Sequence, residues 1–247
     1  MEKESKIKAL KKYVFISFII IAIVISIFLM VRYGVEGEKN LPLELKEITI
    51  ISSIYAQSTN EENKLESSVE QENDIFISFK DNPKIDSKVE TIRIENLKVE
   101  KASELGTIKI LKPTSNENLK YFQNSTEDYS NKVLEYSANT SDNMEKQQFY
   151  QDGGTIAFRI SNQGLGNYVL TDGEQVSYNG KLLEKLGASS EDIKLKATMD
   201  IVLIVDKNEK YKGTISFELP ADEFKDNGIV TKQIKDFDNV IFKKVTD

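Results

Sequence analysis

An uncharged, apolar run near the start of the chain dominates the pattern of hydrophobic and polar positions. It extends from Tyr13 to Val31 (YVFISFIIIAIVISIFLMV), and only its two serines are polar. At about 1.5 Å rise per residue, a helix of this run spans roughly 28 Å, close to the thickness of the hydrocarbon core of a bilayer. The run therefore predicts a transmembrane helix, which we place at residues 13–32. No second run of this kind follows, so the chain is expected to cross the membrane once.

Beyond the run, apolar and polar residues alternate with the period of two that is typical of half-buried strands. The clearest alternation predicts a hairpin of two strands, Lys194–Val205 and Tyr211–Leu219, joined by a turn at Asp206–Glu209. In the first strand the polar face becomes apolar at Val202 and Ile204. This change predicts that the end of the strand is covered on both faces.

Weaker alternation predicts six more strands and one short helix. The strands are Leu45–Ser52, Asp74–Lys80, Val89–Val99, Thr107–Leu111, Thr155–Ile160 and Val240–Val245. A change of phase in the third of them predicts a β-bulge near Glu95 and Asn96. Asn179 is expected to cap a helix over Lys181–Leu186, which Gly187 ends.

Taken together, these elements predict a mainly β, sandwich-like domain over residues 45–247, in addition to the N-terminal transmembrane helix. Two stretches do not fit the pattern. Ala56–Asn73 contains five glutamates and one lysine, and we expect an exposed connection or a weak helix there. Thr114–Gln148 is long and polar, and we expect it to fold back as an extra hairpin. The length of Thr114–Gln148 is compatible both with a functional loop and with a tolerated insertion.

The charges that flank the apolar run predict its orientation. Residues 1–12 form a short basic tail with five lysines and two glutamates, whereas residues 32–40 carry two basic and two acidic side chains. Because lysine-rich flanks stay in the cytoplasm, the tail is expected inside, and the linker at 33–44 and the β domain outside the cell membrane. A cleaved signal peptide is one alternative, but its apolar part is shorter and ends at a small-residue site. A buried core helix is the other, although such helices seldom lack polar residues on every face.

The composition limits the chemistry that is open to the outer part of the chain. The absence of histidine removes imidazole bases and ligands, and the absence of cysteine removes disulfides, thiol nucleophiles and thiolate ligands. Residues 33–247 carry 27 basic and 38 acidic side chains, a net charge near −11. Such a surface repels nucleic acids. We therefore expect no nucleic-acid partner, no cofactor and no bound metal.

Carboxylate pairs and glycine-rich segments are the remaining candidates for a site. Asp236–Phe237–Asp238 and Asp222–Glu223 contain possible calcium ligands, but the EF-hand spacing is absent, and such pairs usually lie at turns or strand ends. Asp152–Gly153–Gly154 and Gly164–Leu165–Gly166 match no phosphate-binding motif, so we interpret them as turns beside strands. With 40 acidic residues, a carboxylate pair for hydrolysis is inevitable on paper. The sequence therefore assigns no catalytic, cofactor-binding or metal-binding residue.

Three segments of the outer part carry a resemblance to known proteins. They are YGVEGEKNLPLELKEITIIS at 33–52, GGTIAFRISN at 153–162 and ATMDIVLIVDKNEKYKGTISFELP at 197–220. They resemble a group of uncharacterised single-pass membrane proteins of clostridia-like, low-GC Gram-positive bacteria. The resemblance implies an anchored bacterial protein, which agrees with the excess of lysine over arginine. That group has no assigned activity, so no functional residue is carried over.

Three functions are compatible with the sequence. The first is a non-enzymatic module of the cell envelope, held to the lipid bilayer by Tyr13–Val31, which contacts another protein or a wall component outside. The second is a regulator or subunit of a membrane complex that acts through the transmembrane helix. The third is a carboxylate-based hydrolase. The absence of histidine and cysteine favours the first.

Overall fold

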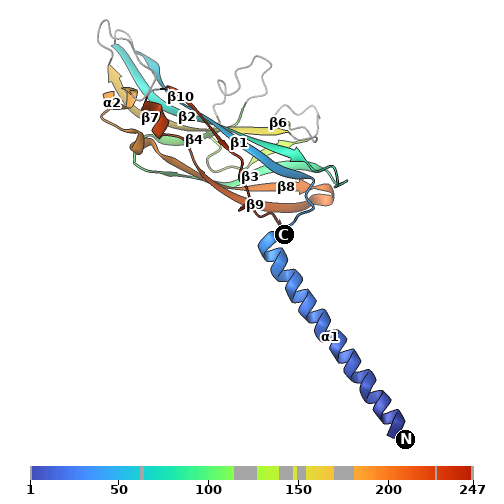
Figure 1. The fold of residues 1–247 in the computed structure, drawn as a ribbon. Helices are drawn as coiled ribbons and strands as arrows, with labels where there is room; N and C mark the ends of the chain where they lie inside the picture. The colour runs from blue at the N-terminus through green and yellow to red at the C-terminus, as the bar shows by residue number, and fades with distance from the viewer. Residues whose placement is uncertain are drawn as a thin grey trace. The chain divides into compact units, whose positions relative to one another are not determined.

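The protein consists of an N-terminal helix and a separate β domain, as seen in the computed structural model (Figure 1). The structure describes residues 2–61, 64–113, 127–138, 147–148, 154–169, 181–225 and 227–245. The first unit comprises Met1–Lys39 and the second Asn40–Asp247. Most of the described residues of the second unit lie in two sheets, which confirms the prediction of a mainly β, sandwich-like domain.

The N-terminal unit is a single helix, α1 (Glu2–Glu36), which extends beyond the predicted segment in both directions. Its described side chains from Tyr13 to Glu36 are all exposed within the structure. The helix ends where Gly37 adopts a positive φ of 68° and its amide donates to the Tyr33 carbonyl at 2.8 Å. This is the usual glycine C-cap of a helix.

The first sheet has five strands in the order β10 (Ile229–Ile234), β1 (Leu43–Glu61), β2 (Lys64–Asp81), β7 (Thr155–Val169) and β4 (Thr107–Leu111). All neighbours in it are antiparallel. The pairing of β1 with β10 brings Ile48 opposite Ile234 and so joins distant parts of the chain. The sequence analysis did not predict β10, because this edge strand has no buried residue among its six.

The second sheet has six strands in the order β11 (Lys243–Val245), β9 (Glu209–Glu218), β8 (Leu195–Val205), β3 (Val89–Lys101), β5 (Leu134–Ser137) and β6 (Gln147–Gln148). The predicted hairpin is confirmed as β8 and β9, joined by the 3-10 turn η2 (Asp206–Asn208). Val202 and Ile204 are buried, so the end of β8 is covered on both faces, as predicted.

The inward faces of the two sheets form one apolar core. It contains Ile48 and Phe158 from the first sheet, and Ile92, Ile201 and Leu203 from the second. Alternate residues along each strand supply these side chains, since successive residues of a strand point to opposite faces. Figure 1 shows the two layers packed face to face.

A second apolar cluster covers the first sheet beyond the main core. There α2 (Lys181–Lys185), η1 (Ser190–Ile193) and η3 (Asp222–Lys225) place Leu182, Leu183, Ile193 and Phe224 against the strands. The predicted helix is thus present with nearly the expected bounds, while its proposed cap, Asn179, lies outside the described residues.

A row of buried polar side chains separates the two clusters on the inward face of the first sheet. It comprises Ser52, Gln71, Asn73 and Asn162. The Ser52 hydroxyl donates to Asn73 Oδ1 at 2.6 Å, and Asn73 Nδ2 donates to the Ile160 carbonyl at 3.1 Å. These bonds connect β1, β2 and β7 through side chains as well as through the backbone ladder.

The interpretation of Ala56–Asn73 as an exposed connection or a weak helix was wrong. β1 continues to Glu61 and β2 begins at Lys64, and the two strands pair along their whole described length. The buried positions near the start of β2 include the polar residues Gln71 and Asn73 as well as the apolar Val69. The alternation of apolar and polar residues that marks a strand is therefore hidden in the sequence.

The predicted bulge in β3 is confirmed. The register against β8 shifts between Glu95 and Lys98, and Asn96 has a φ of 52°. The Asn96 amide donates to Asp200 Oδ2 at 2.8 Å, which holds the irregular residue against the neighbouring strand. Asparagine tolerates this left-handed conformation better than most residues.

The interpretation of Gly164–Leu165–Gly166 as a turn beside a strand was wrong, because these residues lie inside β7. The register with β2 shifts there, between Val69 and Gln71. Gly164, with a φ of 67°, marks the irregularity. The other glycine-rich candidate is described only at Gly154, whose carbonyl accepts from the Phe79 amide at 2.9 Å.

Only part of the predicted extra hairpin at Thr114–Gln148 is described. In this part, β5 pairs antiparallel with β3 and parallel with β6, so the described pairing is not that of a hairpin. Residues 114–126 and 139–146 lie outside the described residues. The predicted last strand, Val240–Val245, is strand only at Lys243–Val245.

Gly106 is a position where a side chain is expected to be costly. Its φ is 70°, and a Cβ there would lie 2.2 Å from Asn162 Oδ1. We expect Gly106→Ala to lower the free energy of unfolding by about 2–4 kcal/mol, from backbone strain and overpacking together. Gly164→Ala is the matched control, since its φ is 67° but nothing lies within 4 Å of the new Cβ. Urea denaturation of both variants should show the larger loss for Gly106; equal losses would contradict the steric argument.

Candidate functional site

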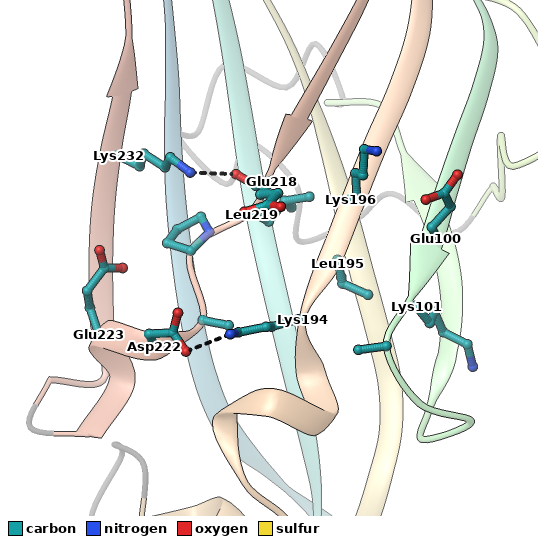
Figure 2. A pocket seen from close by; sticks show the side chains of 13 residues that line it. Glu100, Lys101, Lys194, Leu195, Lys196, Glu218, Leu219, Asp222, Glu223 and Lys232 are labelled. Carbon is teal, nitrogen blue, oxygen red and sulfur yellow. Dashed lines mark hydrogen bonds and ion pairs between the residues drawn. The ribbon is translucent and has the colours of Figure 1, made fainter.

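A pocket of about 350 Å³ lies where several strands end (Figure 2). The end of β3, the start of β8, the segment after β9 and one residue of β10 form its walls. The residues that line it are Glu100, Lys101, Ala102, Lys194, Leu195, Lys196, Glu218, Leu219, Pro220, Ala221, Asp222, Glu223 and Lys232. Four lysines and four carboxylates are among them, so the charges of the lining residues balance.

Two of the pocket's lysines have contacts in or near its lining: Lys194 forms ion pairs, and Lys232 bonds a backbone carbonyl. Lys194 Nζ lies 3.2 Å from Asp222 and 2.7 Å from Glu191, and Figure 2 shows the first of these contacts. Lys232 Nζ donates to the Glu218 backbone carbonyl at 3.0 Å, which connects the edge strand β10 of the first sheet to the second sheet. The strand registers place Lys196 beside both Glu100 and Glu218.

The contacts of Lys194 favour its charged form. The hydrogen bond that Lys194 donates to Glu191 raises the pKa of Lys194, and its bond to Asp222 acts in the same direction. The amine therefore stays protonated at neutral pH and cannot serve as a nucleophile, which needs the neutral form.

A second polar group lies on the outward face of the first sheet, across β1, β2 and β7. The Tyr55 hydroxyl lies 3.0 Å from Glu70 and 2.9 Å from Glu72. Arg159 reaches Glu72 at 2.5 Å and Asp74 at 2.5 Å, with a further bond to Asp74 at 3.0 Å. The Arg159 side chain is only 15% exposed, so this is a largely buried ion pair on a sheet face.

We call the five side chains of Tyr55, Glu70, Glu72, Asp74 and Arg159 the Tyr55–Arg159 network. Burial shifts the pKa values of two of its members. Burial raises the pKa of Tyr55 well above its ordinary value, and the negative charge of Glu72 raises it further. Burial also raises the pKa of Glu72, although the charge of Arg159 acts in the opposite direction. The hydrogen bond that Tyr55 donates to Glu72 also lowers the pKa of that carboxyl, whereas the neighbouring charges of Asp74 and Glu70 raise it.

The hydrolase hypothesis predicted a cleft that holds two close acidic groups, and the network is where the structure brings carboxylates together. Glu70 and Glu72 follow each other on the same face of β2, and the Tyr55 hydroxyl contacts both. Both carboxylates lie on the outward face of the sheet, where they contact the side chains of Tyr55 and, for Glu72, Arg159. Their contacts are those of a structural ion-pair network, which perturbs pKa values without catalysis.

The carboxylate pairs considered for calcium lie at turns. Asp236 Oδ1 accepts from the Asp238 amide at 3.1 Å, which is a turn contact, and Asp222 pairs with Lys194. Within the described ranges, no group of three or more acidic residues is placed to hold a metal ion. The structure does not bring the two pairs together with a third ligand.

The sequence analysis missed the Tyr55–Arg159 network. Three of its members, Tyr55, Glu70 and Glu72, lie in or next to the stretch that was taken for a connection. The signal that could have found it is the outward series Glu70, Glu72, Asp74, which has the period of a strand.

Comparison of the chain with protein-family models, with curated proteins and with solved structures gives no match. The resemblance to the clostridia-like group thus stays a prediction.

Proposed function

We propose that the protein is a single-pass membrane protein whose β domain lies outside the cell membrane as a non-enzymatic interaction module of a bacterial envelope. The observation that carries the proposal is the apolar helix Tyr13–Glu36, of which no residue in its most apolar window is buried within the structure. Such a surface is unstable in water and stable in lipid. The five lysines before it support a cytoplasmic N-terminus.

The described sites support binding over catalysis as the role of the β domain. In the pocket of Figure 2 Lys194 pairs with Asp222, and in the Tyr55–Arg159 network the carboxylates contact protein groups. The acidic outer part favours a partner with basic or neutral surface. Lipid contacts come from Tyr13–Val31, and the contact outside is with a protein or a wall component.

Membrane fractionation tests the anchor. We expect the full chain to sediment with membranes and to resist extraction by alkaline carbonate, and protease added to intact cells to digest the β domain. The double variant Ile20→Asp/Ile23→Asp places two charges in the apolar segment, each costing about 3 kcal/mol on insertion scales. It should appear in the soluble fraction, whereas Ile20→Leu/Ile23→Leu should stay in the membrane. A soluble native chain, or a β domain that protease leaves intact on whole cells, would overturn the proposal.

A further inference from the structure

The edge of the first sheet is only partly covered. β10 pairs with β1 from Ile48 to Ser53, and the Ile54 amide still donates to the Gly228 carbonyl at 3.1 Å. β1 then continues to Glu61, and its only strand partner there, among the residues that the structure describes, is β2. Within the described part of the chain, more than a third of this 19-residue strand therefore has no strand on one edge, which we call the free edge.

The alternation of the backbone identifies the groups on this edge. In an antiparallel ladder, the amide and carbonyl of one residue point to the same neighbour, and those of the next residue point to the other. Ile54 points to the β10 side. The regular pairing with β2 continues without a shift, so Ala56, Ser58 and Asn60 point to that side as well. None of the described strands pairs with the backbone groups on that side of Ala56, Ser58 and Asn60.

This edge lacks the usual protection against another strand. Exposed edges normally carry charges, prolines or bulges that prevent pairing. The sequence from Ile48 to Asn60 has no charged residue and no proline, and β1 has no bulge after Glu47. Where β10 begins, an open groove of about 630 Å³ borders the edge, next to Ile229, which is 65% exposed.

We propose that the free edge of β1 binds the same edge of a second copy of this chain, so that two first sheets form one continuous antiparallel sheet. The pairing register that uses the backbone amides and carbonyls of all three residues, Ala56, Ser58 and Asn60, is centred on Ser58. It places Ala56 opposite Asn60 of the other copy and Ser58 opposite Ser58. Each of these pairs exchanges two hydrogen bonds, and the arrangement has the two-fold symmetry of most homodimers.

The charge pattern selects a second copy over a strand from an oppositely charged partner. A basic partner strand would find one carboxylate on the free edge of β1, Glu61 at its end, while two copies place Glu61 opposite Tyr55 and bring no like charges opposite each other. The outer part carries 27 basic and 38 acidic residues, so its net negative charge makes two copies repel each other at long range. Salt screens this repulsion within about 8 Å at physiological ionic strength. Pairing should therefore strengthen as salt increases, whereas binding to a basic partner should weaken.

Disulfide trapping tests the proposal directly, because the native chain has no cysteine. In the proposed register the two Ser58 Cα atoms lie about 5.5 Å apart, within the range of a disulfide. We expect full-length Ser58→Cys, oxidised in membranes or mild detergent, to give at least about tenfold more covalent dimer than Ser53→Cys. Ser53 is the matched control since β10 covers it on the same strand. The dimer yield should rise between low salt and 0.5 M salt.

A second measurement fixes the register and does not depend on one variant. Residue 57 of one copy should lie opposite residue 59 of the other, so differently tagged Gln57→Cys and Thr59→Cys chains should crosslink when mixed more than either does alone. Equal dimer yields at residues 53 and 58, or a mixed pair that is no better than its single components, would overturn the proposal. Circular dichroism of each variant should show native β content, which excludes unfolding as the cause.

Discussion

Replacing Arg159 by methionine is expected to lower the free energy of unfolding at pH 7 by about 3 kcal/mol, because it leaves Glu72 and Asp74 without their cation in a poorly hydrated place. Both carboxylates are less than a quarter exposed, and Arg159 binds them at 2.5 Å. Thermal and denaturant unfolding of the full chain in detergent would measure the loss. Arg93→Met is the matched control: Arg93 is 34% exposed and pairs with Glu135 alone, so about 1 kcal/mol is expected there.

The effect of Arg159→Met should depend on pH with a definite sign. The pKa of Glu72 in the folded state is already raised above its ordinary value of 4.5, so the folded state binds more protons than the unfolded one. The contribution of this group to the free energy of unfolding therefore falls as pH rises through the folded pKa. Loss of Arg159 raises that pKa further, so the deficit should be largest at neutral pH and shrink as pH falls towards 4.5. A deficit that grows on acidification would contradict this assignment.

Replacing Phe158 by alanine is expected to cost about 3–5 kcal/mol, since it opens a cavity in the middle of the sandwich. Phe158 is fully buried in the main core and lies opposite Ile75 on β2. The same substitution at Phe76, which is only partly buried and belongs to a small outward cluster, should cost about 1 kcal/mol.

The comparison of Phe158→Ala with Phe76→Ala also tests the register of the first sheet. A slip by one residue would exchange the two faces, because successive side chains point to opposite sides. Urea denaturation should rank Phe158 well above Phe76. The reverse order would show that the faces are assigned the wrong way round.

The sequence predicts those strands in which alternation is undisturbed. β9 alternates along the strand and β8 alternates up to Asp200, and their hairpin turn is local, so both strands and their pairing were predicted. The bulge at Asn96 was visible as a change of phase. Strands whose inward positions are polar, such as the β2 segment with Gln71 and Asn73, escape the same reasoning. Buried polar side chains take the place of apolar ones there, and Asn73 bonds Ser52 and the Ile160 carbonyl, which a hydrophobic pattern does not report.

The candidate sites could not be predicted, because they depend on pairing between distant parts of the chain. Arg159 and Asp74 are 85 residues apart and meet only because β7 pairs with β2. Lys232 and Glu218 meet through the ends of strands in different sheets. Nothing in the local sequence indicates either contact. The absence of histidine, by contrast, limits the chemistry of every such site from the composition alone.

The pairing of β1 with β10 has a consequence for how the domain forms in the cell. β1 emerges from the ribosome early, but the strand that pairs with its other edge, β10, is complete only when Ile234 has been synthesised. Contacts of such long sequence separation make folding slow, on the order of milliseconds to seconds. Until then the apolar strands are exposed to other nascent chains. The first sheet is therefore completed only late in the synthesis of the chain.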